Sequence, residues 1–329
     1  MGRIKWGILG TATIAMEQVV PAMLKSEFCE VVGIASRGIA KAEKAAKQFQ
    51  IPKFYGSYED LLNDGEIDAV YIPLPNHLHV EWALKAMKAG KHVLVEKPIA
   101  LSSRQAQYLK EEAEKYPDLK IMEAFMYKFH PQWIKAKELI DQGAIGTLKT
   151  IQSSFSFFDD DPNSIVNKKD FGGGSLMDIG CYPISISRFL FDAEPKSVMA
   201  SITYDAKTEV DILASGILEF DQGSSTFFSA IQLFEGQQVR LFGTTGSIEF
   251  QIPFNPPADQ VVNLSLVKEE DEEVISFDIC DQYTLQVDAF SKTILNNTTV
   301  PFGIDDAVKN MIVIEKLRES HDLGKRISL

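Results

Sequence analysis

Three ionisable side chains occupy two stretches of the chain whose residue types can move a proton. Lys97 directly follows an apolar run and precedes Pro98, within GKHVLVEKPIA. Asp178 and Tyr182 stand four residues apart in GGGSLMDIGCYP, so they share one face if the segment is helical. Tyrosine is a weak acid with a pKa of about 10, and a neighbouring ammonium lowers that pKa by stabilising the phenolate. A lysine–tyrosine pair beside a nicotinamide can therefore pass a hydroxyl proton while hydride moves to the ring, with Asp178 orienting Lys97.

Each of these stretches also has an ordinary structural explanation. Pro183 disfavours helical geometry at Tyr182, and that tyrosine is equally acceptable as a core aromatic with a satisfied hydroxyl. The glycines at 172–174 allow close backbone approach. His77 and His79 resemble a pair of metal ligands, but no Cys, Asp or Glu neighbour completes a set, so we expect no metal.

The stretch WGILGTATIA, behind MGRIK, has two interpretations that place the protein in different compartments. It has the charge and short apolar core of a secretory leader, and it also fits a first strand running into a phosphate loop. Helix and strand signals continue after it as a βαβ unit, which a cleaved leader has no reason to begin. Gly10-x-Ala12-x-x-Ala15 is then a variant of G-x-G-x-x-G/A, with Gly10 in the tight turn and Ala15 at the helix–strand packing position.

The residues after the second expected strand favour NADP(H) over NAD(H). Enzymes that use NAD place an acid there for the ribose hydroxyls, whereas this chain has Ser36 and Arg37, with Lys41 one turn later. A guanidinium and a hydroxyl suit a 2′-phosphate through charge-assisted hydrogen bonds. We also expect the phosphate loop and other strand ends to contact the cofactor. These residues are Gly10, Thr11, Ala12, Thr13, Ile14, Leu74, Pro75, Asn76, His79, Glu96 and Lys97.

Alternating strand and helix signals over the first ~120 residues predict an α/β fold with a parallel sheet. Strands are expected at 4–9, 30–35, 67–74, 92–95 and 119–124, and helices at 14–25, 39–49, 58–63, 77–89 and 102–116. Ser57 and Ser102 are the expected N-caps of the helices at 58–63 and 102–116. The alternation of strand and helix signals then ends. A helix at 131–142 and a strand at 148–158 precede β-rich segments from 196 to 277, and helices follow at 282–295 and 305–320. The second half therefore predicts an antiparallel or mixed sheet.

Composition and charge argue against several classes of partner. The 329-residue chain has 33 basic and 46 acidic side chains, a formal net charge of −13. This balance is a poor match for nucleic acid or an anionic membrane, and no apolar run approaches the ~18 residues of a membrane span. Cys29, Cys181 and Cys280 are odd in number and far apart, which argues against a disulfide framework and predicts a cytoplasmic protein.

Five motifs together resemble the glucose–fructose oxidoreductase/inositol dehydrogenase/MocA (Gfo/Idh/MocA) family. They are Gly10-x-Ala12, PNHLH, AGKHVLVEKP, MEAFMYKFHP and GGGSLMDIGCYP, and the resemblance covers nearly the whole chain. The resemblance implies an N-terminal doubly wound parallel Rossmann domain at 1–124 and a C-terminal α/β domain with an open, mostly antiparallel sheet at 125–302. It also implies that the final helix, 303–329, packs back on the first domain and that Lys97 is catalytic.

Within that family, the branch of dihydrodiol dehydrogenases and NADP-dependent D-xylose dehydrogenases is the most similar. Tyr182 stands where inositol dehydrogenases carry His, and IPKFYGSYEDLL fits the same branch. The resemblance implies hydride transfer between NADP(H) and a CH–OH or C=O group of a small polyol, aldose or dihydrodiol. The alternative is a non-catalytic NADP(H) sensor of the same fold, which has no need to keep both Lys97 and Tyr182.

The expected substrate pocket includes Met126, Phe155 and Tyr283. Lys128 and Val166 border it at positions where relatives often carry Arg. β-rich segments of the second domain, such as 224–234, have no obvious helix to cover both faces of their sheet. We therefore expect a homodimer or tetramer formed through that sheet.

Overall fold

The computed structural model describes residues 2–269 and 271–329 and divides the chain into two compact units. The first unit contains 1–126 and 281–308, and the second contains 127–280 and 309–329. The end of the chain is thus divided differently from the expectation of 125–302 for one domain and 303–329 packing on the other. The helix at 282–295 belongs to the first unit, and most of the final helix belongs to the second.

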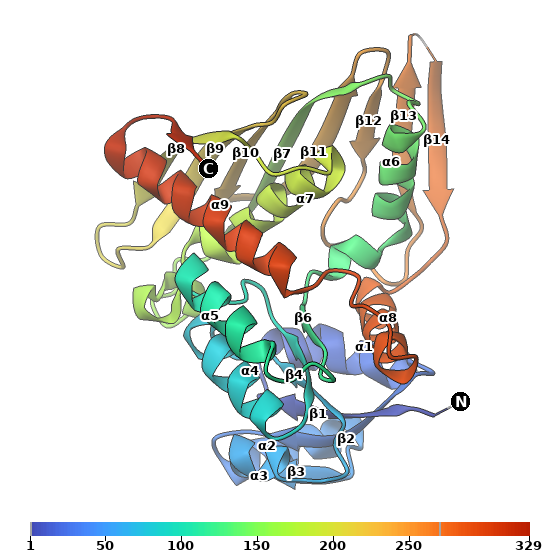
Figure 1. The fold of residues 1–329 in the computed structure, drawn as a ribbon, viewed down its shortest axis with the longest axis vertical. Coiled ribbons are helices and arrows are strands. Elements are labelled where there is room, and N and C mark those ends of the chain that lie inside the picture. The colour runs from blue at the N-terminus through green and yellow to red at the C-terminus, as the bar shows by residue number, and fades with distance from the viewer. Residues whose placement is uncertain (1, 270) are drawn as a thin grey trace. The chain divides into compact units, whose positions relative to one another are not determined.

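The first unit is built on a six-stranded sheet in the order β3-β2-β1-β4-β5-β6, with every pair parallel (Figure 1). The strands are β1 (Ile4–Leu9), β2 (Cys29–Ala35), β3 (Lys53–Tyr55), β4 (Ala69–Ile72), β5 (His92–Val95) and β6 (Ile121–Glu123). This is the doubly wound arrangement expected from the sequence. The strand order reverses between β1 and β4, and such sheets bind ligands at that switch point, beyond the carboxyl ends of the strands.

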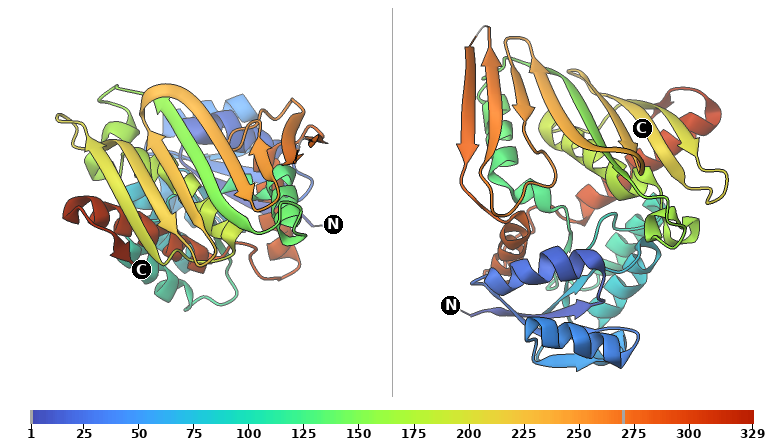
Figure 2. Two further views of the ribbon diagram at one scale, coloured as in Figure 1. Left: turned by 90° about the horizontal axis from the view of Figure 1, so that it is seen from above. Right: turned by 180° about the vertical axis from the view of Figure 1, so that it is seen from behind.

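Helices cover both faces of this sheet. They are α1 (Val20–Lys25), α2 (Ile39–Phe49), α3 (Tyr58–Leu62), α4 (His79–Lys88), α5 (Ser103–Ala113) and α8 (Gln282–Leu295). Figures 1 and 2 show α1 beside α8 on one face and α4 beside α5 on the other. Trp6 of β1 is fully buried and donates from Nε1 to the Ser291 hydroxyl at 3.2 Å, which ties α8 to the sheet. Ser57 and Ser102 cap α3 and α5 as expected.

The second unit is built on a nine-stranded sheet in the order β14-β13-β12-β11-β7-β10-β9-β8-β15. Its strands are β7 (Leu148–Phe158), β8 (Ser197–Tyr204), β9 (Asp211–Glu219), β10 (Ser224–Ala230), β11 (Gln232–Gly243), β12 (Ser247–Phe250), β13 (Val262–Lys268), β14 (Asp271–Phe277) and β15 (Ile327–Ser328). Among the described strands of this sheet, only β7 and β10 pair in parallel. The prediction of an open, mostly antiparallel sheet is confirmed.

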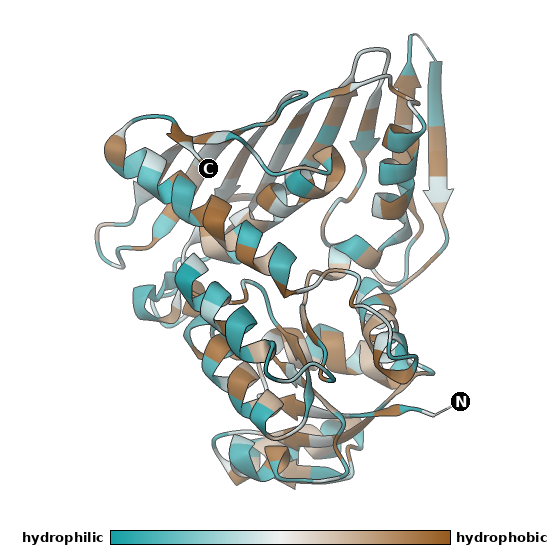
Figure 3. Cartoon of the chain, in the orientation of Figure 1, coloured by the Kyte–Doolittle hydropathy of each residue, from teal (hydrophilic) through white to brown (hydrophobic). Residues whose placement is uncertain are grey.

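Three helices pack on one face of this sheet: α6 (Pro131–Asp141), α7 (Cys181–Phe191) and α9 (Ile304–Leu323), the last of which runs mainly in this unit. Trp133 of α6 stacks on Phe250 of β12, with ring centroids 4.1 Å apart. Figure 3 shows that hydrophobic and hydrophilic turns alternate along α9. None of the helices that the structure describes is long and apolar enough to cross a membrane.

The opposite face of the nine-stranded sheet carries no helix among the described residues of this unit (Figure 2). Met199 and Ile217 lie opposite each other on β8 and β9, so they share one face, and they are 44% and 40% exposed. Phe228 of β10 is also more than a third exposed, whereas its neighbour Phe227 is buried beneath α9. This face therefore presents apolar side chains to its surroundings.

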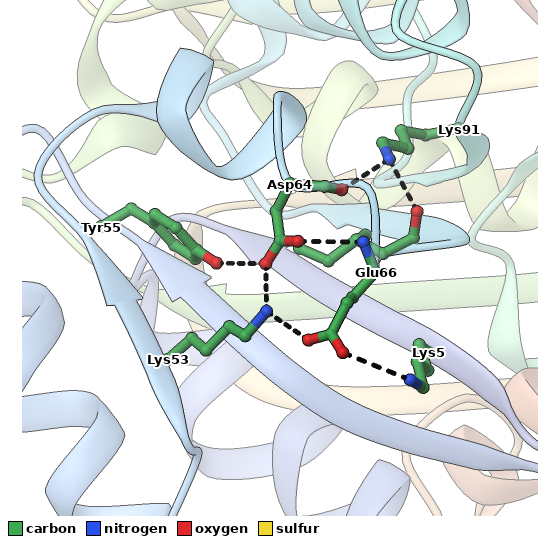
Figure 4. Close-up of polar contacts among 7 residues, drawn as sticks. Lys5, Lys53, Tyr55, Asp64, Glu66 and Lys91 are labelled. Atoms are coloured by element: carbon green, nitrogen blue, oxygen red, sulfur yellow. Dashed lines mark hydrogen bonds and ion pairs between the residues drawn. The ribbon is translucent and has the colours of Figure 1, made fainter.

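A polar cluster braces the amino ends of the strands of the first unit, at the edge opposite the switch-point loops (Figure 4). The Asp64 carboxylate accepts hydrogen bonds from the Lys53 ammonium at 2.6 Å and the Tyr55 hydroxyl at 2.5 Å. Lys53 also pairs with Glu66, and the buried Lys91 ammonium donates to the backbone carbonyl of Asp64 at 2.8 Å. These donors, Lys53 first, hold the pKa of Asp64 well below its usual range. The cluster saturates its own charges and is a structural brace.

Candidate cofactor and catalytic site

Gly10 follows β1 and occupies the turn that the sequence predicted. Its φ of +130° is a conformation that residues with a Cβ rarely adopt. A Cβ at this position would also lie 3.2 Å from the Leu74 side chain, which follows β4. The two loops on either side of the switch point therefore meet at Gly10 and Leu74. This close approach explains why the position needs glycine.

The segment after Gly10 presents an uncapped helix start. No side chain caps it, and Thr11, Ala12 and Thr13 are partly or fully exposed, so their N–H groups can serve an anion. Ala15 is fully buried, as its packing position requires. The first turn, Ala15–Val19, is a π turn that passes into α1. Such turns are rare and often mark functional sites.

A second region that can attract an anion follows β2, and it carries two basic side chains. Ser36 is only 6% exposed, whereas Arg37 and Lys41 are exposed. Within residues 2–269 and 271–329, neither cation forms an ion pair. The N-terminus of α2 begins just after them, at Ile39, without a side-chain cap. The N-terminus of a helix is electrostatically unfavourable for cations. The start of α2 with Arg37 and Lys41 beside it is therefore a favourable arrangement only when an anion binds there.

Lys97 lies just beyond the carboxyl end of β5 in a segment, 96–99, that forms neither helix nor strand. Side chains from neighbouring strands hold this segment. Glu96 accepts a hydrogen bond from the Tyr71 hydroxyl of β4 at 2.6 Å. The buried Glu123 of β6 accepts one from the Ile99 N–H at 2.7 Å. The backbone on both sides of Lys97 is thereby tied to the sheet.

His79 differs from its expected role as a group that faces the cofactor. Its side chain is fully buried, and both ring nitrogens lie at backbone carbonyl oxygens: Nδ1 is 2.8 Å from that of Pro98, and Nε2 is 2.6 Å from that of Leu74. Burial lowers the pKa of His79 to about 4, although both carbonyls act in the opposite direction. The ring is therefore neutral near pH 7, and it links two loops of the sheet.

The other expected residues of the first unit lie at the same strand ends. Pro75 and Asn76 are partly exposed in the short 3₁₀ turn between β4 and α4. Burial and then the Glu96 charge raise the pKa of Tyr283, and the Lys97 charge opposes them, so the Tyr283 phenol lies within electrostatic reach of both. Met126 is only 4% exposed, at the end of the first unit.

The glycine run at 172–174 serves the protein's own backbone in the second unit. A Cβ on Gly173 would collide with the Val166 carbonyl. A Cβ on Gly174, where φ is +104°, would collide with the carboxylate of Asp211. The close approach predicted from the three glycines is therefore an approach of the chain to itself.

Asp211, at the start of β9, fixes the helical segment that follows the glycines. It is 2% exposed, and its Oδ2 accepts from the Leu176 N–H at 2.6 Å and from the Ser175 hydroxyl at 3.1 Å. Arg318 of α9 approaches its other oxygen at 3.7 Å. Burial raises the pKa of Asp211, and Arg318 opposes this.

Asp178 and Tyr182 lie in one continuous helical segment, which the sequence had left open because of Pro183. Asp178 is in a second π turn, Leu176–Gly180, and Tyr182 is in the α7 helix that continues from it. Pro183 does not break the segment. The irregular turn directly before α7 lies where a proline, which has no N–H to donate, would interrupt regular hydrogen bonding.

The Tyr182 side chain stands in a cluster of aromatic rings. It is 4% exposed, with Phe155 edge-on at 5.6 Å, Phe254 at 5.4 Å and Tyr127 at 5.8 Å between ring centroids. Tyr182 and the expected pocket residue Phe155 are thus brought together. Lys128 is buried and directly follows Tyr127 of this cluster in the sequence. Val166 is partly exposed, and its carbonyl lies against Gly173. Lys97 belongs to the first unit, and Asp178 and Tyr182 belong to the second.

Sequence reasoning missed three groups that build the site. Glu123 ends an apolar strand, and a carboxylate in that position was a signal that it serves the backbone of a neighbouring loop. Asp211 is the first residue of a strand, and a carboxylate in that position was a comparable signal. Tyr71, inside an apolar run, gave no signal, because a buried tyrosine needs a partner that only the fold identifies.

Comparison with known proteins gives consistent matches. Residues 4–124 match the oxidoreductase family with an NAD-binding Rossmann fold (GFO_IDH_MocA), and residues 133–249 match the GFO/IDH/MocA C-terminal domain. The chain is 41% identical to an uncharacterized oxidoreductase, ORF334, of Rhizobium meliloti, over 98% of both chains. It is 37% identical to D-xylose 1-dehydrogenase (NADP(+)) 2 of Haloferax volcanii, over 98% of this chain and 99% of that protein.

A solved structure shares the complete fold. KijD10, a 3-ketoreductase from Actinomadura kijaniata in complex with NADP and TDP-benzene, superposes with a TM-score of 0.91 at 28% identity, covering 97% of this chain and 98% of that one. Both domain models and near-complete relatives thus confirm the resemblance seen in the motifs, and the chain belongs to the Gfo/Idh/MocA family of oxidoreductases.

Proposed function

We propose that this chain is an NADP(H)-dependent oxidoreductase that transfers a hydride between the nicotinamide and a CH–OH or C=O group of a small polyol, aldose or dihydrodiol. The observation that carries the proposal is Lys97, held by its flanking backbone at a strand end next to the switch-point loops. The names of two similar proteins, an NADP-dependent D-xylose dehydrogenase and a ketoreductase bound to NADP, support the cofactor and the reaction class.

The residues of the first unit fit a phosphorylated dinucleotide. Gly10 leaves room for the pyrophosphate, which would accept from the uncapped N–H groups of residues 11–14. Ser36, Arg37 and Lys41 would hold the 2′-phosphate, which supplies the anion that this helix start lacks. When bound, the nicotinamide accepts or delivers the hydride.

The proton moves through side chains of the chain itself. In alcohol oxidation, the Tyr182 phenolate takes the hydroxyl proton as the C–H bond breaks, and in carbonyl reduction the Tyr182 phenol returns it. The Lys97 ammonium stabilises the phenolate and binds the substrate oxygen, and Asp178 orients Lys97. This assignment requires the two units to present Lys97 and Tyr182 to one substrate.

The aromatic rings around Tyr182 support a carbohydrate-like substrate. Phe155 offers an apolar edge to the C–H face of a sugar or a cyclic diol, while the hydroxyls of such a substrate need polar partners. We infer that Met126, Phe155 and Tyr283 line the pocket.

A substrate panel tests the proposal. D-xylose, other aldoses, inositol and a trans-dihydrodiol are incubated with NADP⁺, and the absorbance of the reduced nicotinamide is followed. Turnover of at least one compound, with a preference for NADP⁺ over NAD⁺, is the expected result. Tight NADPH binding with no spectral change for any compound in either direction would instead favour a sensor.

We also infer a cytoplasmic homodimer or tetramer. The three widely spaced cysteines fit a reducing compartment. The uncovered face of the nine-stranded sheet, with Met199, Ile217 and Phe228 exposed, supports self-association through that face. Light scattering at micromolar concentration should give a multiple of 36.7 kDa. Ile217→Lys should shift the mass towards the monomer, and a wild-type monomer would contradict the inference.

A further inference from the structure

The His79 imidazole is placed to control the loop that carries Lys97. It is fully buried and lies between two backbone carbonyls, that of Pro98 at 2.8 Å and that of Leu74 at 2.6 Å. Pro98 directly follows Lys97. Leu74 is the residue whose side chain lies against Gly10 of the phosphate loop. One side chain therefore connects the lysine segment with the wall of the expected cofactor site.

The contact with Pro98 completes a set of hydrogen bonds around Lys97. Glu96 is held by the Tyr71 hydroxyl, and Ile99 is held by the Glu123 carboxylate. Between them the Lys97 N–H donates to the Glu96 carboxylate at 3.3 Å, and proline has no N–H, so the Pro98 backbone can be held only through its carbonyl. The His79 Nδ1 is the nitrogen at that carbonyl.

We propose that His79 is a positioning residue for Lys97: its Nδ1–H holds the Pro98 carbonyl and thereby fixes where the lysine side chain leaves the backbone. The proposal rests on the proposed role of Lys97 in proton transfer. His79 itself touches neither substrate nor cofactor, since both ring nitrogens face carbonyls of the first unit.

A neutral His79 can donate a hydrogen bond to only one of its two carbonyl neighbours, and Pro98 is the favoured acceptor. Carbonyl oxygens only accept, and a neutral imidazole has a single N–H to donate. Burial keeps the ring neutral near pH 7, because it lowers the pKa of His79 to about 4. The bond to Pro98 restrains the segment next to Lys97, whereas Leu74 lies two residues beyond the end of β4, in a loop that carries no proposed catalytic residue.

Three substitutions separate the two bonds. In His79→Asn the amide nitrogen replaces Nδ1 and can still donate to Pro98. In His79→Gln it replaces Nε2 and can donate only to Leu74. In His79→Phe both donors are lost while the ring volume is kept. His92→Phe is the matched control, because His92 is a partly buried histidine at the opposite end of β5 that serves the Lys120 N–H.

The first measurement is hydrogen exchange of the Lys97 and Ile99 amides in the full chain, which needs no substrate. Exchange should rise in His79→Phe and His79→Gln and stay near wild type in His79→Asn and His92→Phe. The second is kcat and the KM for NADP⁺ with the most active compound of the panel. His79→Phe should lose about 10²-fold in kcat, the scale expected for a misplaced catalytic group, with little change in KM. His79→Asn should restore most of that loss.

The outcomes distinguish this proposal from the proposed function. Unchanged amide exchange and kcat in folded His79→Phe would overturn it, and so would better rescue by Gln than by Asn. Where His79→Phe does not fold, the Asn and Gln variants decide alone. Lys97→Met is measured in parallel. Full turnover in Lys97→Met would refute the catalytic role of Lys97, whereas lost turnover there combined with normal His79 variants would refute the positioning role alone.

Discussion

The segment that carries Lys97 and the helix that carries Tyr182 are held in place by different means. Residues 96–99 form no regular structure, and single side chains reach their backbone from elements far away in sequence, such as His79 and Glu123. Tyr182 stands in a helical segment that Asp211 holds at its start and that is otherwise hydrogen-bonded within itself. The Tyr182 ring packs among other rings.

The difference has consequences for what a substitution does. A loop held by a few hydrogen bonds loses its geometry when one of them is removed, with a small cost to the fold as a whole. A helix buried in a core distributes its restraints, so a substitution there lowers stability before it changes position. Changes around Lys97 should therefore affect turnover, and changes around Tyr182, the reacting hydroxyl excepted, should affect stability.

The largest effect is expected from Tyr182→Phe, which removes the proposed acid/base and keeps the ring among Phe155 and Phe254. Turnover should fall by ~10²–10⁴-fold, because that is the usual contribution of a positioned acid/base. NADP(H) affinity and thermal stability should stay close to wild type. The measurements are single-turnover rates, cofactor titration and thermal unfolding. Wild-type turnover, with chemistry shown to limit the rate, would mean that the proton takes another route.

The next largest effect should appear in stability. Asp211→Ala leaves the buried Leu176 N–H without its acceptor, so we expect the free energy of unfolding to fall by about 1–3 kcal/mol. Turnover per folded molecule should remain near wild type, because the rest of the helix is held by packing. Chemical denaturation and kinetics below the transition measure the two quantities.

Asp211→Asn is the control for that substitution, since its amide oxygen can still accept from Leu176. A large loss of turnover in Asp211→Ala with unchanged stability would contradict the difference drawn between the Lys97 segment and the Tyr182 helix. It would show that the Tyr182 helix depends on one distant side chain, as the Lys97 segment does.

An effect of similar size, on cofactor binding and not on stability, is expected at Arg37. Arg37→Ala should weaken NADP(H) binding by about 1–3 kcal/mol, the scale of hydrogen bonds to a charged group, and leave NAD(H) binding nearly unchanged. Lys47→Ala is the control, because Lys47 is an exposed cation on α2, the helix that follows Arg37, and its charge is paired with Glu43. Fluorescence titration of both cofactors gives the four affinities. Equal losses for NADP(H) and NAD(H) would place the 2′-phosphate elsewhere.

Sequence patterns predicted what depends on neighbours along the chain. The turn at Gly10, the caps Ser57 and Ser102, and the helix at 282–295 all follow from local residue types, and the structure confirms them. The order of strand and helix signals likewise predicted both sheets, because alternating strands and helices favour a parallel sheet and consecutive strands favour an antiparallel or mixed one.

The features that the sequence did not predict depend on contacts between segments that are distant along the chain. His79 was expected to face the cofactor because PNHLH follows a strand end, yet only the fold shows that its ring lies under Pro98, 19 residues away. The glycines at 172–174 predicted a close approach correctly but not its partner, Asp211, from another strand. The division at 281–308 and 309–329 also follows from packing, since amphipathic helices do not encode which core they join.

The smallest effect should come from the polar cluster at the amino ends of the strands, far from the switch-point loops. Lys53 and Tyr55 hold the pKa of Asp64 below its unfolded value, which is about 3.9. The ionised carboxylate therefore stabilises the fold above that unfolded value, and the stabilisation is lost as the pH falls towards the lower folded-state pKa. Asp64→Asn should lower Tm at pH 7 by about 2–4 °C.

The deficit of Asp64→Asn should shrink below about pH 4, because Asp64 of the unfolded wild-type chain then binds a proton that the folded chain does not, which removes the stabilisation. Asp60→Asn, an exposed acid on the adjacent α3, is the control and should show no such convergence. Thermal unfolding over a pH series measures both variants, with turnover recorded alongside. Like the Lys97 segment, this cluster fixes loops through side-chain hydrogen bonds. Unchanged turnover would therefore show that the Lys97 loop matters through the residue it carries and not through being hydrogen-bonded as such. Lost turnover at full stability would contradict that conclusion.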